Sequence, residues 1–405
     1  MSDPSLSVPG RRLPAMTDSP EPDRLHEAMA TRVARANLPG LVTVLARGDK
    51  VRIDPIGTLS VDGTAPMRPD TIFRITSMTK PVLGVATMML VEEGRLRLDE
   101  PVDRLLPELA GRGVLRRLDG PLDDTVPAAR PSTVEDLLTF RMGHGLLFEP
   151  TFQPAYPVVT ATDELGLAIG PPDPRTPHDP DEWIRRFGTL PLMHSPGERW
   201  QYDTAAEVLG VLVARAAGRP LPEFLRDRIF APLGMVDTGF TVPAAHADRL
   251  AAFCAADPET GALTERDVSG PGAWTAPPTF PSGASGLVST GPDYLAFARL
   301  LLHRGVHQGR RLLSEKSVEL ITTNHLTPEQ IATAGPILDG YGWGYCVSVA
   351  VTPDETSPAP GSYGWTGGYG TAWFTDPHRD LIAIVLTQTA DFLFDGGLAE
   401  FRKLA

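Results

Sequence analysis

The sequence has few cysteines, fewer basic than acidic residues, and no long apolar run. Its only two cysteines are Cys254 and Cys346, too few for a disulfide framework and typical of a reducing compartment. Lys and Arg number 37 against 50 Asp and Glu, a formal charge of -13, which disfavours nucleic acid and anionic membranes as partners. No apolar run approaches the roughly 18 residues that a membrane-spanning helix needs. We therefore predict no nucleic-acid or membrane partner.

The first twenty residues lack the continuous apolar core of a secretory signal. Together with the scarce cysteines, this predicts a cytoplasmic protein. Glycine (39) and proline (41) are frequent but follow no period, and 42% of the 405 residues are apolar. These figures are typical of a globular chain with a large core and long ordered loops.

Strand patterns occupy both ends of the chain. Residues 41–46 and 51–57 flank "RGDK", which predicts two strands joined by a tight turn. The Arg-Gly-Asp triplet there could be an adhesion motif, but a hairpin turn is the better interpretation. Near the C-terminus, residues 341–351, 370–377 and 381–389 are aromatic and β-branched runs bounded by glycine and proline, as strands are.

Helical patterns dominate the middle of the chain. Residues 82–91 are apolar on all sides, which predicts a core helix, and proline-rich loops separate further helical patterns up to about residue 284. We predict an α/β (α+β) fold in which an antiparallel sheet, built from both termini and flanked by helices, carries an inserted, mostly helical lobe. The predicted division is residues 1–80 and 285–405 for the sheet lobe and 81–284 for the helical lobe, with the active site in the cleft between them.

The segment "FRITSMTKPV" places Ser77 three residues before Lys80 at the start of the predicted core helix. On a helix, residues i and i+3 share a face, so a neutral lysine amine there could take the serine proton. Burial would favour the neutral amine by lowering the pKa of Lys80. A capping serine followed by a solvated lysine is the alternative interpretation, because this spacing also arises by chance.

Three further segments favour chemistry. In "HSPGERWQYDTAAEVLG", Tyr202 and Thr204 follow a turn and precede an apolar helix, and Asp203 between them is expected to be solvated. "SGASGLVST" is glycine-rich and leads into an amphipathic helix. "GWTGGYGT" places Trp365, Thr366 and adjacent glycines on or beside a strand, where glycines allow a ligand to approach the backbone.

These segments, with "STVEDLLTFRMGHGL" and "FAPLGMVDTGF", resemble the serine β-lactamase and penicillin-binding-protein superfamily (class C β-lactamase-like) over nearly the whole chain, and family VIII carboxylesterases most closely. The resemblance implies Ser77 as the acylated nucleophile, Lys80 as its proton acceptor, and Tyr202 as a general base or relay. Which of Lys80 and Tyr202 takes the proton stays open. It also implies that the backbone N–H groups of Ser77 and Gly368 form the oxyanion hole, and that Trp365-Thr366-Gly367 occupies the place of the Lys-Thr-Gly strand motif.

Two departures from the family pattern bear on the substrate. Trp365 replaces the lysine that would pair with the carboxylate of a penicillin or a peptide. Thr204 replaces an asparagine amide, with a different donor pattern. Both changes favour neutral acyl substrates, most simply short-chain carboxylic esters bound by Trp365, Thr366, Gly367 and Thr204. The loops between Phe148 and His194 are expected to line the acyl pocket or only to fill the surface.

Other functions stay open on the same residues: an amidase, a D-aminopeptidase or weak β-lactamase, an acyltransferase, or a binding module without turnover. The pair His303 and His307 lacks the glutamate of a metalloprotease motif, and no phosphate or dinucleotide loop is present, so we predict neither metal nor cofactor. His144 is interpreted as a satisfied buried or turn histidine. The sequence does not predict the oligomeric state.

Overall fold

The computed structural model describes residues 20–35, 38–170, 176–338, 340–353 and 359–405. The helices are α1 (Pro20–Ala34), α2 (Thr79–Glu92), α3 (Val134–Leu138), α4 (Pro157–Glu164), α5 (Pro180–Phe187), α6 (Thr204–Ala217), α7 (Leu221–Leu225), α8 (Ala231–Leu233), α9 (Gly291–Leu302), α10 (Glu315–Ile321), α11 (Pro328–Ala332) and α12 (Gly397–Leu404). The strands are β1 (Gly40–Arg47), β2 (Lys50–Gly57), β3 (Phe73–Arg74), β4 (Gly113–Leu115), β5 (Thr125–Pro127), β6 (Phe253–Ala256), β7 (Leu263–Asp267), β8 (Val288–Ser289), β9 (Val306–His307), β10 (Arg310–Arg311), β11 (Gly342–Trp343), β12 (Ser348–Val349), β13 (Tyr363–Gly367), β14 (Thr371–Asp376) and β15 (Leu381–Thr387).

The main sheet joins the two ends of the chain. Its strand order is β11-β12-β13-β14-β15-β1-β2, and every neighbouring pair is antiparallel. Strand β1 pairs with β15 from Leu41 opposite Thr387 to Arg47 opposite Leu381. The predicted fold class is therefore confirmed, and the Arg-Gly-Asp triplet lies at the turn between β1 and β2.

Side chains of the central strands alternate between two apolar layers, as a pleated strand requires. On one face, β1 and β15 pack against α1 and α12; the residues are Leu25, Met29, Leu41, Leu45, Ala383, Val385, Leu398 and Phe401. On the other face, they pack toward α2 and α9; the residues include Val42, Val44, Ile382, Ile384, Tyr294 and Phe297. Both sheet faces are thus covered, which explains the nearly continuous apolar sequences of β1 and β15.

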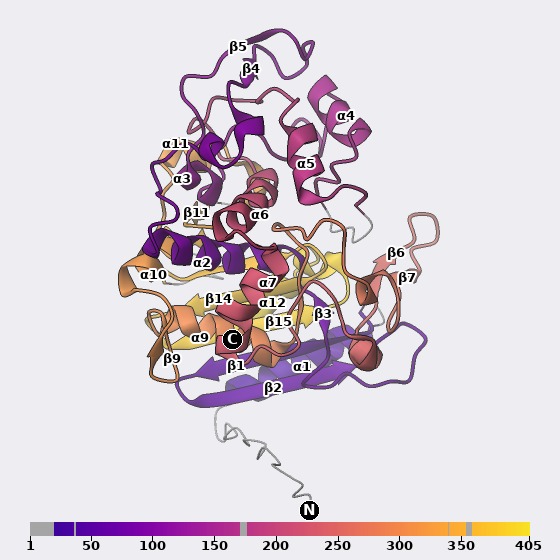
Figure 1. Ribbon diagram of the computed structural model, residues 1–405. Coiled ribbons are helices and arrows are strands. Elements are labelled where there is room, and N and C mark those ends of the chain that lie inside the picture. Colours follow the sequence, from indigo (N-terminus) through magenta and orange to yellow (C-terminus); the bar gives the residue numbers. More distant parts are fainter. Residues whose placement is uncertain (1–19, 36–37, 171–175, 339, 354–358) are drawn as a thin grey trace, which may run out of the picture.

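Helix α2 is the predicted core helix, with every residue from Thr79 to Leu90 buried. A side chain at Gly84 would meet the Tyr345 carbonyl oxygen at 2.6 Å, so this glycine lets the helix approach the segment before β12. In Figure 1, α2 lies between the sheet and the helices α3, α5 and α6 above it. The position of α2 brings its first turn to the boundary between the sheet and these helices.

Two sequence predictions needed correction in detail. Residues 341–351 form only the short strands β11 and β12, because Cys346 between them has a φ of 64° that interrupts extended backbone. The segment from Phe148 to His194 carries helices α4 and α5 and is not made of loops alone. Both cysteines are buried. In the described part of the chain, no helix has the length and apolarity needed to cross a membrane.

Candidate active site

Ser77 lies in a 3-10 turn, Thr76–Met78, that leads directly into α2. Thr76 has a φ of 44°, an uncommon conformation for a β-branched residue and one that is often found at functional sites. The turn is held from outside, since the Tyr294 hydroxyl donates to the Met78 carbonyl at 2.9 Å and the Leu287 N–H donates to the Thr79 hydroxyl at 3.1 Å. Ser77 is the only partly exposed residue of this turn.

Lys80 is fully buried, and its ammonium group reaches three acceptors. Its Nζ donates to Ser77 Oγ at 2.9 Å, to Asp203 Oδ1 at 2.7 Å and to the Ala284 carbonyl at 3.0 Å. An ammonium group has three hydrogens, so each has a partner. The same Nζ lies 4.5 Å from the centre of the Tyr202 ring.

The expected lowering of the Lys80 pKa is wrong. Burial alone would lower it, but the Asp203 carboxylate and the neighbouring Tyr202 outweigh burial and raise the pKa of Lys80 above its usual value. The buried counter-charge is the physical reason, because an adjacent carboxylate favours the charged ammonium. Lys80 is therefore a cation at neutral pH.

Asp203 is not the solvated carboxylate that was expected. It is 2% exposed, and besides binding Lys80 it accepts from the Gly170 N–H at 3.1 Å through Oδ2. Its φ of 81° lies in a region that favours glycine. The ion pair and the hydrogen bond hold this unusual backbone at the start of α6, directly after Tyr202.

Tyr202 is 7% exposed, and its hydroxyl accepts from Trp365 Nε1 at 2.8 Å. Burial raises the pKa of Tyr202; the Lys80 charge and hydrogen bonds from Ser77 and Trp365 act in the opposite direction. Trp365 thus contributes a hydrogen-bond donor as well as an apolar surface. Trp365 packs edge-on against Trp343, with ring centres 4.6 Å apart.

Glu207 forms a second acidic group behind Lys80. Burial, reinforced by the Asp203 charge, raises the pKa of Glu207 to about 7. Its carboxyl group bonds the Ser282 hydroxyl at 2.6 Å and the Ala284 N–H at 3.3 Å. The sequence analysis did not single out Glu207, which lies in the first turn of α6, shortly after Asp203.

The end of β13 lies against the Ser77 turn. A side chain at Gly367 would meet the Ile75 carbonyl at 2.3 Å and the Thr76 hydroxyl at 2.4 Å, so only glycine fits. The next residue, Gly368, is exposed, with open space where a side chain would project. The structure therefore brings Ser77, Lys80, Tyr202, Trp365 and Gly367 together, with Gly368 adjoining them.

Thr366 and Thr204 stand apart from this network. Thr366 is partly exposed on β13, whereas Thr204 is completely buried in the first turn of α6, and its hydroxyl has no hydrogen-bond partner among the described residues. Their substrate-binding roles stay predictions. Within the described ranges, no group of three or more His, Cys, Asp or Glu side chains is arranged to hold a metal ion.

A serine on a short turn, a buried lysine one turn later, and a tyrosine on the segment just before α6 meet beside strand β13. This is the arrangement that the sequence resemblance implies for a serine-nucleophile site. The sequence model of the beta-lactamase family matches residues 25–404. The chain belongs to the beta-lactamase family.

Two curated relatives match over most of their length. Protein Rv1367c of Mycobacterium tuberculosis is 41% identical over 360 residues, covering 87% of this chain and 86% of the relative. Esterase EstB of Burkholderia gladioli is 31% identical over 396 residues, covering 91% and 90%. Among solved structures, EstCE1, described as a hydrolase with promiscuous acyltransferase activity, has a TM-score of 0.76 at 24% identity and covers 95% of this chain and 98% of its own. The last likeness concerns the fold.

Proposed function

We propose that this protein is a serine hydrolase that cleaves short-chain carboxylic esters through an acyl-enzyme on Ser77. The observation that carries the proposal is the contact of Lys80 Nζ with Ser77 Oγ at 2.9 Å inside a buried network that also holds Tyr202. The similarity to esterase EstB supports an ester as substrate. A small neutral ester is the expected binding partner.

The charges favour Tyr202 over Lys80 as the proton acceptor. Lys80 is a cation whose three hydrogens are already engaged, so it has no lone pair with which to accept a proton. Because Lys80 donates to Ser77 Oγ, the serine hydrogen is free to point at the Tyr202 hydroxyl oxygen. The Lys80 charge and the Trp365 N–H stabilise negative charge on that oxygen. Tyr202 as phenolate is the proposed general base.

The reaction then follows the acyl-enzyme route. Ser77 Oγ attacks the ester carbonyl carbon while Tyr202 takes its proton, and the backbone N–H groups of Ser77 and Gly368 stabilise the oxyanion. The C–O bond breaks, and the leaving alkoxide receives the proton from Tyr202. Water repeats the sequence in the second half, which releases the acid and returns the proton to Ser77.

The walls of the site support a neutral substrate. Trp365 lies within β13, at the position where the family resemblance implies a lysine. It donates its N–H to Tyr202, so its remaining surface is apolar. A carboxylate of a penicillin or a peptide would find no ammonium at this position.

An acyltransferase is the second candidate, because an alcohol that outcompetes water would take the acyl group from Ser77. The cytoplasmic location and the two-lobe division at residues 80 and 285 stay predictions.

The test compares p-nitrophenyl butyrate hydrolysis by the wild type, Ser77→Ala and Tyr202→Phe. We expect Ser77→Ala to abolish turnover and Tyr202→Phe to reduce kcat by on the order of 10²-fold or more, since general-base catalysis contributes about that much. Ser314→Ala, at the cap of α10, is a matched serine control and should keep full activity. Full activity of Ser77→Ala would refute the nucleophile, and full activity of Tyr202→Phe would refute the proposed base.

A further inference from the structure

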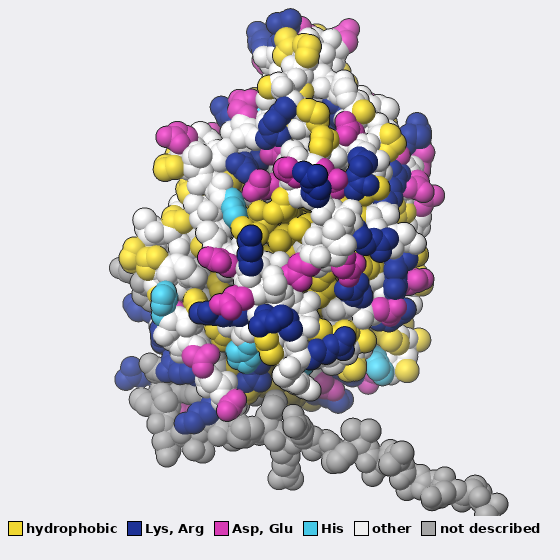
Figure 2. Space-filling model, turned by 60° about the vertical axis from the view of Figure 1, so that its left-hand side comes forward, with side chains coloured by type: hydrophobic (Ala, Val, Ile, Leu, Met, Phe, Trp, Pro, Cys, Tyr) yellow, Lys and Arg dark blue, Asp and Glu magenta, His cyan; other side chains and the backbone are white. Residues whose placement is uncertain are grey.

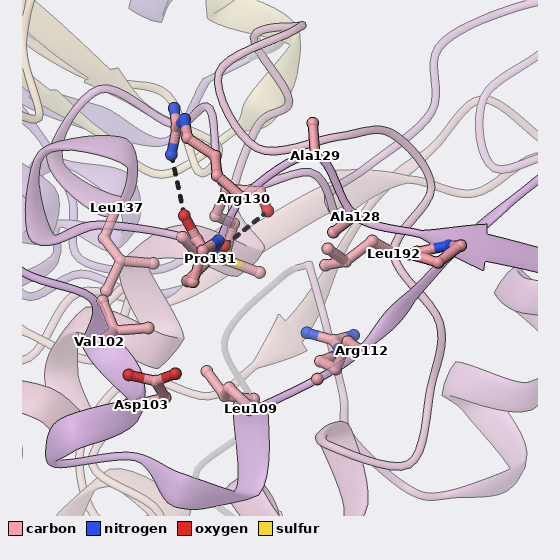
Figure 3. A pocket seen from close by; sticks show the side chains of 14 residues that line it. Val102, Asp103, Leu109, Arg112, Ala128, Ala129, Arg130, Pro131, Leu137 and Leu192 are labelled. Carbon is pink, nitrogen blue, oxygen red and sulfur yellow. Dashed lines mark hydrogen bonds between the residues drawn. The ribbon is translucent and has the colours of Figure 1, made fainter.

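A separate pocket lies among residues that take no part in the Ser77 network. It has a volume of about 300 Å³ and lies between the segment Val102–Leu109, strand β4, and the chain that links β5 to α3. Its walls are mainly apolar and include the side chains of Val102, Leu109, Leu137, Met142 and Leu192. Figure 3 shows these walls, with Arg112 below Leu192 at the base of the pocket.

Arg112 is the unusual member of this lining. Its Nε donates to the Leu190 carbonyl at 2.8 Å and one terminal nitrogen reaches the Pro191 carbonyl at 3.4 Å. Its guanidinium carbon lies 4.4 Å from the centre of the Phe187 ring. Among the described residues, no carboxylate lies at ion-pair distance from Arg112, and none accepts a hydrogen bond from its Nη1. A cation in partly apolar surroundings is thus held in place without a counter-charge.

The charges around Arg112 are consistent with the lack of a counter-charge. Burial lowers the pKa of Arg112 to about 9, with no acidic group acting against it. Arg130, the other arginine of the lining, is neutralised by Asp136, to which it donates from both terminal nitrogens. Asp103 is also in the lining, but Leu109 separates it from Arg112 in the view of Figure 3. One cation therefore remains available to a ligand.

We propose that this pocket binds a small monocarboxylate with an apolar body, whose carboxylate pairs with Arg112. Guanidinium groups bind carboxylates through paired hydrogen bonds, and the Nη1 hydrogens are available. The Asp103 carboxylate and the apolar walls disfavour a dianion such as phosphate. At roughly 30 Å³ per water-sized group, the volume holds on the order of ten non-hydrogen atoms, which is the size of a medium-chain acid.

Isothermal titration of the wild-type protein with hexanoate tests this proposal, with hexanamide as the uncharged probe of the same shape. We expect saturable 1:1 binding of hexanoate and none of hexanamide. Arg112→Gln should weaken hexanoate binding on the order of tenfold or more, because a charged hydrogen-bonded pair is lost.

Two controls keep the result specific. Arg116→Gln removes an exposed arginine of the same region and should leave hexanoate binding unchanged. Thermal unfolding and p-nitrophenyl butyrate hydrolysis should show that Arg112→Gln is folded and retains its ester turnover, which separates this pocket from Ser77. The proposal is overturned if the wild type shows no saturable binding at millimolar hexanoate, or if Arg112→Gln binds hexanoate as well as the wild type does.

Discussion

At the scale of single residues, Asp203 determines which group can act as a base. It is a buried carboxylate 2.7 Å from Lys80 Nζ, and it accounts for the raised pKa of this lysine against the effect of burial. A lysine held as a cation acts on Ser77 through its charge and its hydrogen bond. In the proposed mechanism, the proton then moves between Ser77 and Tyr202, whereas the sequence motif alone leaves the choice between Lys80 and Tyr202 open.

This assignment predicts the titration of Lys80 directly. The chain contains only four lysines, Lys50, Lys80, Lys316 and Lys403, so ¹³C-labelled lysine gives few NMR signals. We expect the Lys80 signal to titrate above those of the exposed lysines in the wild type and below them in Asp203→Asn, where burial is no longer opposed by the carboxylate. Asp123→Asn, at an exposed position, serves as the control.

A Lys80 signal that titrates near neutral pH in the wild type would contradict the mechanism and make Lys80 the base.

A second prediction concerns the pH dependence of the activity. The proposed base is a tyrosine whose pKa is raised by burial. Its phenolate fraction grows with pH, so kcat/KM should rise as the pH increases above neutral. A rate that falls over the same range while the protein stays folded would argue against Tyr202.

At the scale of elements, the site depends on how closely the end of β13 approaches the turn before α2. Gly367 and Gly368 are adjacent but have opposite surroundings, since a side chain at Gly367 would meet backbone and hydroxyl atoms near 2.3 Å, whereas at Gly368 it would meet nothing within 4 Å. The pair therefore offers a matched comparison.

We predict that Gly367→Ala moves β13 away from Ser77 and lowers the thermal stability. It should reduce kcat by on the order of tenfold or more, because misplacement of about 1 Å can cost 10²-fold. Gly368→Ala keeps the backbone N–H and should retain most activity and stability. Initial rates and thermal unfolding of both variants check this. Equal effects of the two substitutions would contradict the proposed approach of β13.

Sequence patterns predicted elements better than contacts. The strands of both termini and the buried helix α2 follow from alternation and apolar runs, and the Ser77 to Lys80 spacing predicted the contact between these two side chains. The ion pair of Lys80 with Asp203 was missed because a carboxylate beside a tyrosine gives no signal of burial; its position depends on the backbone of α6 and on Gly170. The Trp365 hydrogen bond to Tyr202 depends likewise on the orientation of an indole ring.

At the scale of the whole molecule, the sheet lies between α2, which follows Ser77, and a supporting layer that consists of helices α1 and α12. Helices α1 and α12 cover the face that is opposite to α2, and Figure 1 shows them behind the strands. On the face shown in Figure 2, acidic and basic side chains are interspersed around a hollow with apolar walls. We therefore predict that substitutions in the layer of α1 and α12 affect stability and leave the reaction rate of the folded protein unchanged.

Phe401 tests this separation, since it is fully buried between α12 and the sheet. Phe401→Ala should reduce the free energy of unfolding by about 3–5 kcal/mol, as large-to-small core substitutions do, without changing kcat of the folded enzyme. Lys403→Ala, on the exposed side of α12, should change neither. Urea unfolding and initial rates at low temperature measure both quantities; a marked fall in kcat for folded Phe401→Ala would contradict the separation.

The pairing of β1 with β15 also sets the order in which the molecule can be completed. Strand β1 is buried along nearly its whole length, yet its neighbour β15 is the last strand in the chain. During synthesis, the β1–β2 hairpin must therefore wait with the β1 edge unpaired until β15, which begins at Leu381, has left the ribosome. Unpaired apolar edges promote aggregation, so the nascent chain is expected to need a chaperone, and folding from denaturant should be slow because its contacts are distant in sequence.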